Sequence, residues 1–511
     1  MKKIISIALC LCLLISSVSI IAFAAEKEDF TITNPYANVD WDSWNAYKTQ
    51  LHCHTTASDG FQPIKEAIAD SYSLDYDIVA ITDHGTINKG WDTVPDTVPI
   101  VRAIKKERTG GAKNPIIPLS AEEYAGYTAG TFDSREYVYE ADGGIVNSGR
   151  VRTHENGLLD VEEGIELNMA TPVCDCHLTG YWSDYGQGLA GVYGDYETPS
   201  CEVAKAGGVT MLSHIGEYVY PDKDSEMHVG QKVDEYFVNK FARIFLDNPG
   251  SSAGMGINSA TDAHTRCDRI LYDQILQKTI PNGVTPWGFT FSDSHNVTSE
   301  NDAYTYMLMP ELSNEALRDC MVNGEFFSVS HYSNGVELNG MPEMEGYKEE
   351  NAEWWKDDTP VITKIEVDDE NDVIKVWGEN FNYITWVSSG NVILRDYDVT
   401  DGYAELDLNS SDLLDDVNMY VRFYLSGDNG ICYAQPMTVK RAGETFAPVA
   451  VPKTHDLPKF LRTLVTVLDW VLFKWSPIVW AFKYFAVGYD PIEQNNKAVR
   501  DAFETILNVK C

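Results

Sequence analysis

The chain has few basic residues for its length. Among 511 residues, 39 are Lys or Arg and 77 are Asp or Glu, which gives a formal net charge of −38, and no block of basic residues stands out. Proteins that bind duplex nucleic acid need lysine and arginine side chains that face the phosphates. Duplex nucleic acid is therefore not an expected partner. The apolar fraction of 44% is ordinary for a soluble protein, and the length predicts two or three domains.

Common catalytic signatures are also missing. The sequence contains no nucleophile elbow, no P-loop and no dinucleotide-binding fingerprint. Cysteine is sparse, because only eight cysteines follow residue 25, too few for a disulfide scaffold in so long a chain. Cys174, Cys176 and His177 lie close enough to suggest zinc, but a second close pair is lacking. Thiolate ligation, a disulfide to a distant cysteine and buried free thiols all stay open.

The first 25 residues have the pattern of a signal peptide. Lys2 and Lys3 precede an apolar run over residues 4–21, and Ala22 and Ala24 form a small-x-small cleavage pattern. The mature protein is therefore expected to be secreted or extracytoplasmic. The alternative is a retained anchor, since the run has marginal spanning length.

The sequence pattern of the rest of the chain changes twice. Residues 44–335 alternate between strand and helix patterns, which predicts an α/β barrel with helices at 64–74 and 98–106. Strands are expected at 76–82, 116–119, 208–213 and 287–292. The polar stretch at about 124–176 reads as an insertion over the site. Residues 360–440 are short alternating runs, which predict a small β-sandwich.

The tail at residues 456–511 has apolar residues at helical spacing. Charged residues such as Lys459, Arg462 and Asp469 interrupt the apolar run, and Pro477 breaks the helix, so a transmembrane helix is not expected. The tail is instead predicted to pack on the body or on a second copy of the chain. A helix lying on a membrane surface is the alternative.

Histidine and acidic residues recur where predicted strands end. His52 and His54 are two residues apart, so on a strand both point to one face, and Asp293 and His295 repeat that spacing. Mixed imidazole and carboxylate ligands suit zinc, manganese or iron rather than calcium. Strand ends gathered by a barrel would bring together the whole set, which is His52, His54, Asp59, His84, Glu122, His177, His214, Asp293 and His295. Glu123 is the neighbouring alternative to Glu122.

These segments resemble the PHP (polymerase and histidinol phosphatase) domain. Residues 51–60 (LHCHTTASDG) are similar to its first motif and residues 81–85 (ITDHG) to its second. Residues 120–122 (SAE) resemble the third, with serine in place of glycine, and residues 207–214 and 292–295 complete the match. The resemblance covers about 290 residues. Export, the insertion and the β-rich extension make the chain most similar to the CehA/McbA-type metallohydrolases.

The resemblance implies a distorted (β/α)7 TIM-like barrel that holds two or three divalent ions, Zn, Mn or Fe, at its strand ends. It implies one ion on His52, His54, Glu122 and Asp293, and a second that shares Glu122 and is held by His177 and His214. A third would lie between Asp59, His84 and His295.

The chemistry expected of such a site is metal-assisted hydrolysis of a small ester, in which metal-bound hydroxide attacks phosphorus or an acyl carbon. Asp59 or His84 could protonate the leaving group. Arg266 and Arg269 are candidates to clamp an anionic substrate, or are ordinary helix-surface salt bridges. Three functions stay open: a phosphoesterase, an ester, amide or carbamate hydrolase, and a non-catalytic secreted protein that holds metal.

Overall fold

A computed structural model describes most of the chain between residues 28 and 452. The described ranges are 28–95, 115–141, 144–170, 175–186, 196–219, 232–259, 265–331 and 358–452, without 398, 400, 411, 412 and 414. The predicted signal peptide, the predicted helix at 98–106 and the predicted tail at 456–511 lie outside them. Within them, no helix combines the length and apolar character that crossing a membrane requires.

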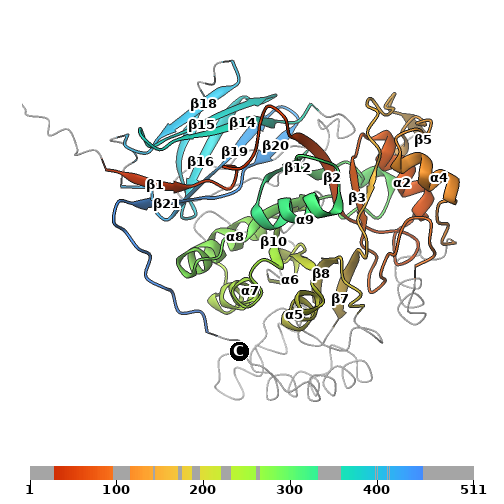
Figure 1. Cartoon of the computed structure of the whole chain (residues 1–511), viewed down its shortest axis with the longest axis horizontal. Coiled ribbons are helices and arrows are strands. Elements are labelled where there is room, and N and C mark those ends of the chain that lie inside the picture. Colours follow the sequence, from red (N-terminus) through yellow and green to blue (C-terminus); the bar gives the residue numbers. More distant parts are fainter. Residues whose placement is uncertain are drawn as a thin grey trace, which may run out of the picture.

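An eleven-stranded sheet contains strands from both ends of the described chain (Figure 1). β2 pairs in parallel with β3, and β3 with β6, whereas β2, β12, β13 and β20 are antiparallel neighbours. The main path is β1 (Phe30–Thr33), β21 (Met437–Arg441), β19 (Tyr420–Gly427), β20 (Gly430–Tyr433), β13 (Phe326–Ser330), β12 (Ala303–Met309), β2 (Asn45–Cys53), β3 (Ile78–Ile81) and β6 (Leu159–Asp160), with β16 (Tyr383–Ser388) and β17 (Asn391–Asp396) attached to β19.

A second sheet carries the other half of the predicted ligands. Its order is β11 (Trp287–Phe291), β10 (Ser252–Ser259), β9 (Val209–Leu212), β8 (Asp175–Tyr181) and β7 (Ile165–Ala170). β9, β10 and β11 are parallel, as buried strands joined by helices must be. The helices α5 (Glu197–Ala206), α7 (Glu235–Asp247) and α8 (Thr265–Thr279) pack against this sheet. The predicted strands at 208–213 and 287–292 are confirmed, and α2 (Ile64–Ser73) confirms the predicted helix.

The strand pairings are those of a mixed, sheet-rich α/β fold and do not show the predicted (β/α)7 barrel. β8 runs antiparallel to both of its neighbours, β7 and β9, so this part of the sheet is not built from βαβ units. The two sheets are joined by isolated parallel bridges, Cys53 with Ser294 and His84 with Glu166. These bridges bring the end of β2 to the end of β11, and the end of β3 to β7.

The stretch predicted as an insertion, 124–176, is partly built into the sheets. After α4 (Ala121–Thr128) and the hairpin β4 (Val138–Ala141) and β5 (Gly144–Asn147), β6 pairs with β3 and β7 pairs with β8. The predicted strand at 116–119 is irregular backbone. Pro118 within it and Pro115 before it cannot donate to a β-ladder, which accounts for the difference.

The short alternating runs near the C-terminus form strands as predicted. β14 (Val361–Asp368), β15 (Val373–Glu379) and β18 (Tyr403–Asp407) make a three-stranded sheet. Ile365 and Ile374 from this sheet share a buried core with Trp386 and Phe423 from the large sheet, so two layers face each other (Figure 1). The large sheet continues from this sandwich into β13 and β2, and β1 pairs with β21.

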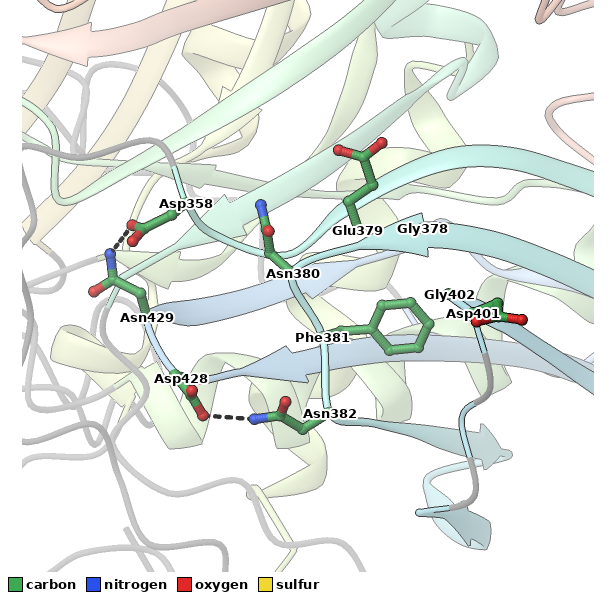
Figure 2. Close-up of a pocket in the computed structure, with 10 residues that line it drawn as sticks. All are labelled: Asp358, Gly378, Glu379, Asn380, Phe381, Asn382, Asp401, Gly402, Asp428 and Asn429. Carbon is green, nitrogen blue, oxygen red and sulfur yellow. Dashed lines mark hydrogen bonds between the residues drawn. The ribbon is translucent and has the colours of Figure 1, made fainter.

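A pocket of about 580 Å³ lies at the loop end of this sandwich (Figure 2). Its floor includes Phe381, and the Asn382 amide donates a hydrogen bond of 2.6 Å to Asp428 across it. The lining residues are Asp358, Gly378, Glu379, Asn380, Phe381, Asn382, Asp401, Gly402, Asp428 and Asn429. No histidine lines this pocket, so it is separate from the cluster of predicted metal ligands.

A buried ion pair ties the helical layer to the large sheet. Arg422 on β19 donates to both carboxylate oxygens of Asp273 on α8, at 2.9 and 2.5 Å, and the Tyr420 hydroxyl donates to the same carboxylate at 2.6 Å. Arg422→Ala would leave Asp273 buried without its cation, which should lower the free energy of unfolding by about 3–5 kcal/mol. Urea denaturation measures this loss. Arg243→Ala, which removes a more exposed pair with Asp247, is the control and should cost less than about 1 kcal/mol; equal losses would contradict the prediction.

Candidate metal centre

His52 lies near the end of β2 and His54 directly follows the strand, and both side chains point to one face. Both side chains are fully buried, and their Nε2 atoms lie 3.1 Å apart. Cys53 between them points to the other face, into the hydrophobic core, as strand alternation requires. The His54 N–H donates to the Ser294 carbonyl at 2.8 Å, which fixes the end of β2 against the loop after β11. The predicted geometry of this pair is confirmed.

Asp83 shapes the loop that presents Asp59. It accepts hydrogen bonds from the Thr55 N–H at 2.8 Å, the Thr55 hydroxyl at 2.6 Å and the Ser58 N–H at 3.1 Å. A Cβ atom at Gly60 would lie 2.4 Å from the His54 carbonyl oxygen, so the tight loop requires glycine there. The result is an Asp59 carboxylate 3.3 Å from His84 Nε2.

His214 and Asp293 follow the parallel strands β9 and β11 and have unusual backbone conformations. Their φ angles are +27° and +51°, in or near the left-handed region that costs an L-residue about 1–2 kcal/mol. Strained conformations of this kind cluster at functional sites, where the fold holds a side chain in a required place. Here they turn both side chains towards β2, so that Asp293 Oδ1 lies 3.2 Å from His52 and 3.0 Å from His54.

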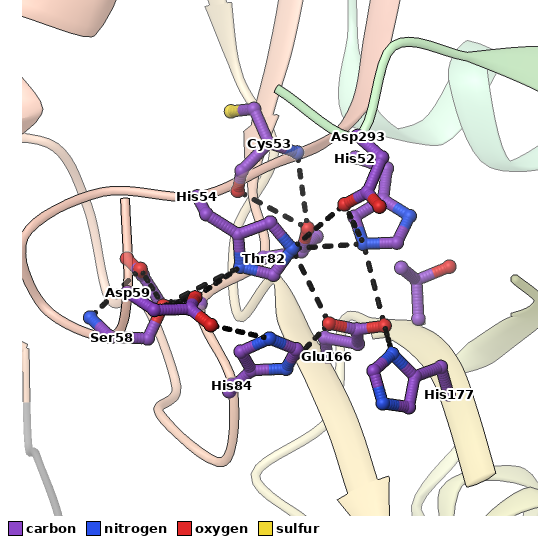
Figure 3. Close-up of polar contacts among 12 residues, drawn as sticks. His52, Cys53, His54, Ser58, Asp59, Thr82, His84, Glu166, His177 and Asp293 are labelled. Atoms are coloured by element: carbon purple, nitrogen blue, oxygen red, sulfur yellow. Dashed lines mark hydrogen bonds and ion pairs between the residues drawn. The ribbon is translucent and has the colours of Figure 1, made fainter. Parts of the chain in front are cut away.

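Glu166 on β7 lies at the centre of the cluster (Figure 3). It is fully buried, and the isolated bridge to His84 brings it beside the end of β3. Five imidazoles surround its carboxylate, with nitrogen–oxygen distances of 3.5 Å for His52, 3.3 Å for His54, 2.6 Å for His84, 2.8 Å for His177 and 3.5 Å for His214.

The electrostatics follow from burying acids among imidazoles. Burial alone would raise the pKa of Glu166, but His177, His84 and His52 hold that pKa well below its usual value. Burial also opposes ionisation of Asp293, yet His52, His54 and His295 keep its pKa low. Burial and the neighbouring His295 and His84 lower the pKa of His54 to about 3. The acids are therefore carboxylates and His54 is neutral, which are the forms that bind metal.

These side chains fall into overlapping groups that can hold metal ions. The ligand atoms within each group lie within 4.8 Å of one another. Both oxygens of Glu166 and Oδ1 of Asp293 are buried with no aligned hydrogen-bond donor in the described chain, and a cation would satisfy them. The groups are His54, Asp59, His84 and His295; His52, Glu166 and His214; His52, His54 and Asp293; and His84, Glu166 and His177.

The prediction for Glu122 is wrong in this structure. Glu122 is exposed in the first turn of α4, away from the cluster. The Ser120 side chain caps this helix and Glu123 completes the capping box, so the SAE segment begins a helix rather than ending a strand. Glu123 also pairs with Lys65. Glu166 occupies the position expected of Glu122, and the alternation in residues 165–170 (IELNMA) is the sequence signal that could have found it.

Of the remaining predicted site residues, the two histidines lie in the cluster and the two arginines are not shown to belong to it. His177, on β8, lies in the cluster 2.8 Å from Glu166, and His295 Nε2 lies 3.5 Å from Asp59. Arg269 is only 2% exposed on α8, so it is not an ordinary helix-surface salt bridge. Arg266 begins α8, and its side chain lies outside the described atoms.

The cysteines whose side chains the structure describes are free thiols. These are Cys53, Cys201, Cys267, Cys320 and Cys432, of which all but Cys201 are buried. Burial raises the pKa of the Cys53, Cys320 and Cys432 thiols, so they are unreactive core residues. Cys174 lies outside the described residues, and the question of a disulfide there stays a prediction.

Comparisons with known proteins add little. No protein family model matches the chain, and no curated protein matches it. One similar solved structure is a two-domain protein from Bacteroides vulgatus that contains a predicted PHP-like metal-dependent phosphoesterase. The two chains are 11% identical, and the match covers 81% of this chain and 91% of that one with a TM-score of 0.34. A likeness this weak carries no argument about fold or function. The proposed function rests on the geometry of the site.

Proposed function

We propose that the chain is an exported metal-dependent hydrolase of small phosphate esters, which uses two or three divalent ions of zinc, manganese or iron. The observation that carries the proposal is the buried Glu166 carboxylate among five imidazoles, with Asp293 against His52 and His54. Closure of the two sheets through the Cys53 and His84 bridges is consistent with a distorted seven-stranded barrel of the PHP type. The proposal of the CehA/McbA branch rests on the signal-peptide pattern, the long insertion and the β-rich extension of the sequence.

The residues divide into three proposed ligand sets, and the Glu166 carboxylate lies close to at least one member of each. His52, His54 and Asp293 would hold one ion, His177 and His214 with Glu166 a second, and Asp59, His84 and His295 a third. Ions bound there would supply an activated water and would polarise the ester oxygen. Asp83 holds the loop that orients Asp59, and the strained backbone at His214 and Asp293 orients those two side chains. His84, whose Nε2 lies 3.3 Å from the Asp59 carboxylate, would pass a proton to the leaving oxygen, and Asp59 would orient its imidazole.

A substrate panel tests the reaction class. Mature protein loaded with Mn²⁺ or Zn²⁺ should hydrolyse chromogenic phosphate mono- or diesters, and Asp293→Ala should reduce that rate by at least about 100-fold because it removes the carboxylate ligand from one set. Activity in the variant equal to wild type would contradict the metal-site assignment. Turnover confined to aryl carboxyl esters or carbamates would replace the phosphoesterase proposal, and metal uptake without turnover would favour a binding protein.

The carboxyl ester, amide or carbamate alternative has an observation in its favour. Arg269, one of the two candidate phosphate clamps, is buried, and the net charge of −38 does not attract anions. The bound ions would then be the main source of positive charge for a phosphate. The panel includes carboxyl esters and carbamates for this reason.

Localisation and assembly also belong to the proposal. The signal-peptide pattern of residues 1–25 supports export, and the amphipathic tail at 456–511 supports contact with a second copy or with a membrane surface. The proposed partner is a small ester substrate, with no role for duplex nucleic acid.

A further inference from the structure

Glu300 is a buried acid that belongs to none of the ligand groups. It follows the short 3-10 helix at Val297–Ser299 and is 1% exposed. Its Oε1 accepts a hydrogen bond of 2.6 Å from the Ser71 hydroxyl on α2, and its Oε2 accepts one of 2.9 Å from the Ser294 hydroxyl. Ser294 lies between Asp293 and His295, so this carboxylate holds the peptide that carries two proposed ligands.

The main chain of Glu300 is linked by hydrogen bonds, through Gln50, to the strand that carries His52. Its carbonyl oxygen accepts hydrogen bonds from the Tyr76 hydroxyl at 2.8 Å and from the Gln50 amide at 3.3 Å. The Gln50 side-chain oxygen in turn accepts from the His52 N–H at 3.2 Å. One buried residue therefore connects the backbone of β2, which carries His52, with the loop after β11, which carries Asp293.

This connection bears on the strained part of the site. Asp293 has a φ of +51°, a conformation that a loop would leave unless its neighbours held it. The Ser294 hydroxyl is held by Glu300, while the Ser294 carbonyl accepts from the His54 N–H at 2.8 Å. Fixing the residue between them limits where the Asp293 and His295 side chains can move.

A carboxylate at this depth carries an energetic cost. Burial raises the pKa of Glu300 to about 7, and the hydroxyls of Ser71 and Ser294 oppose the rise because they stabilise the ionised form. An apolar side chain would avoid the cost of burying a charge, but it could not accept hydrogen bonds from two elements. The buried acid is therefore suited to hold α2 and the loop after β11 together through its two hydrogen bonds.

We propose that Glu300 is a positioning residue of the metal centre, which holds Asp293 and His295 through the Ser294 hydroxyl and keeps them aligned with His52 and His54. This inference rests on the proposed metal-dependent function. Residues that orient metal ligands from behind contribute about 10- to 100-fold to metal affinity. A purely structural acid would contribute to folding alone.

The two serines provide a matched test. Ser294→Ala and Ser71→Ala each remove one hydroxyl from the same carboxylate, but only Ser294 is bonded into the ligand loop. Mn²⁺ stoichiometry and affinity are measured by calorimetry, with urea denaturation of each variant alongside. Ser294→Ala should weaken Mn²⁺ binding by about 10- to 100-fold, whereas Ser71→Ala should bind Mn²⁺ like wild type at a similar cost in stability.

Glu300→Ala and Glu300→Gln complete the test. The alanine variant should lose Mn²⁺ affinity at least as strongly as Ser294→Ala, and the glutamine variant should recover part of it, since its amide oxygen can still accept one hydroxyl. Unchanged affinity in Ser294→Ala, or equal losses in both serine variants, would overturn the inference. If Asp293→Ala also bound Mn²⁺ like wild type, the metal centre itself would have failed, which separates the two failures.

Discussion

Glu166→Gln is expected to remove most metal binding and to lower hydrolysis by at least about 1000-fold. The substitution keeps the size of the side chain but removes the negative charge that faces five imidazoles. Residues that merely orient ligands contribute about 10- to 100-fold to affinity or activity, so a carboxylate shared between ions should contribute more. Bound metal per chain and the rate of phosphate ester hydrolysis are the two measurements.

Glu122→Gln is the matched control for this prediction. It makes the same chemical change at the acid that the PHP-like motif favours, but on the exposed first turn of α4. Its metal content and activity should equal those of the wild type. The reverse outcome, loss in Glu122→Gln and retention in Glu166→Gln, would show that the motif identified the bridging ligand and that the arrangement around β7 is wrong.

The second large effect is on stability. Without ions, the fold buries Glu166 and Asp59 among histidines, and an ion that binds the folded state alone stabilises it by mass action. Zn²⁺ or Mn²⁺ at about 1000 times its dissociation constant should add about 4 kcal/mol to the free energy of unfolding. Thermal denaturation with metal, and after removal of metal by a chelator, measures the difference as a rise in Tm.

Asp293→Ala tests whether that rise comes from this site. The variant lacks the carboxylate ligand of one set, so its Tm should respond much less to metal, whereas Arg243→Ala on the surface of α7 should respond like wild type. A Tm that does not depend on metal in the wild-type protein would argue against a metal centre in the core of the fold. A rise of the same size in Asp293→Ala would place the ions elsewhere.

The sequence alone was sufficient to predict those metal ligands that occur as a pair with a recognisable local spacing. His52 with His54, and Asp293 with His295, are spaced for one face of a strand end, and the second pair follows an apolar run. The structure confirms β2, β9 and β11 and brings eight of the nine predicted ligands into one cluster with Glu166. Strand propensity and alternation also identified the C-terminal strands.

The parts of the fold and of the site that were not predicted depend on contacts between segments far apart in the sequence. The alternation in residues 165–170 can place Glu166 on a strand, but it cannot show that Glu166 faces the metal ligands, because that depends on the bridge to His84 and on the pairing of β7 with β8. The sequence also did not show the direction of β8, so a barrel of parallel strands was predicted where β8 runs antiparallel to both of its neighbours. β1 pairs with β21 across some 400 residues, which no periodicity can show.

The most direct test of the central claim is the location of metal in crystals of the mature protein loaded with Zn²⁺ or Mn²⁺. Anomalous difference maps measured at the absorption edge of the metal would locate each ion. The proposed centre predicts at least two ions that share the Glu166 carboxylate, with His52 and Asp293 on one side and His177 and His214 on the other. Maps without an ion within bonding distance of Glu166 would contradict it.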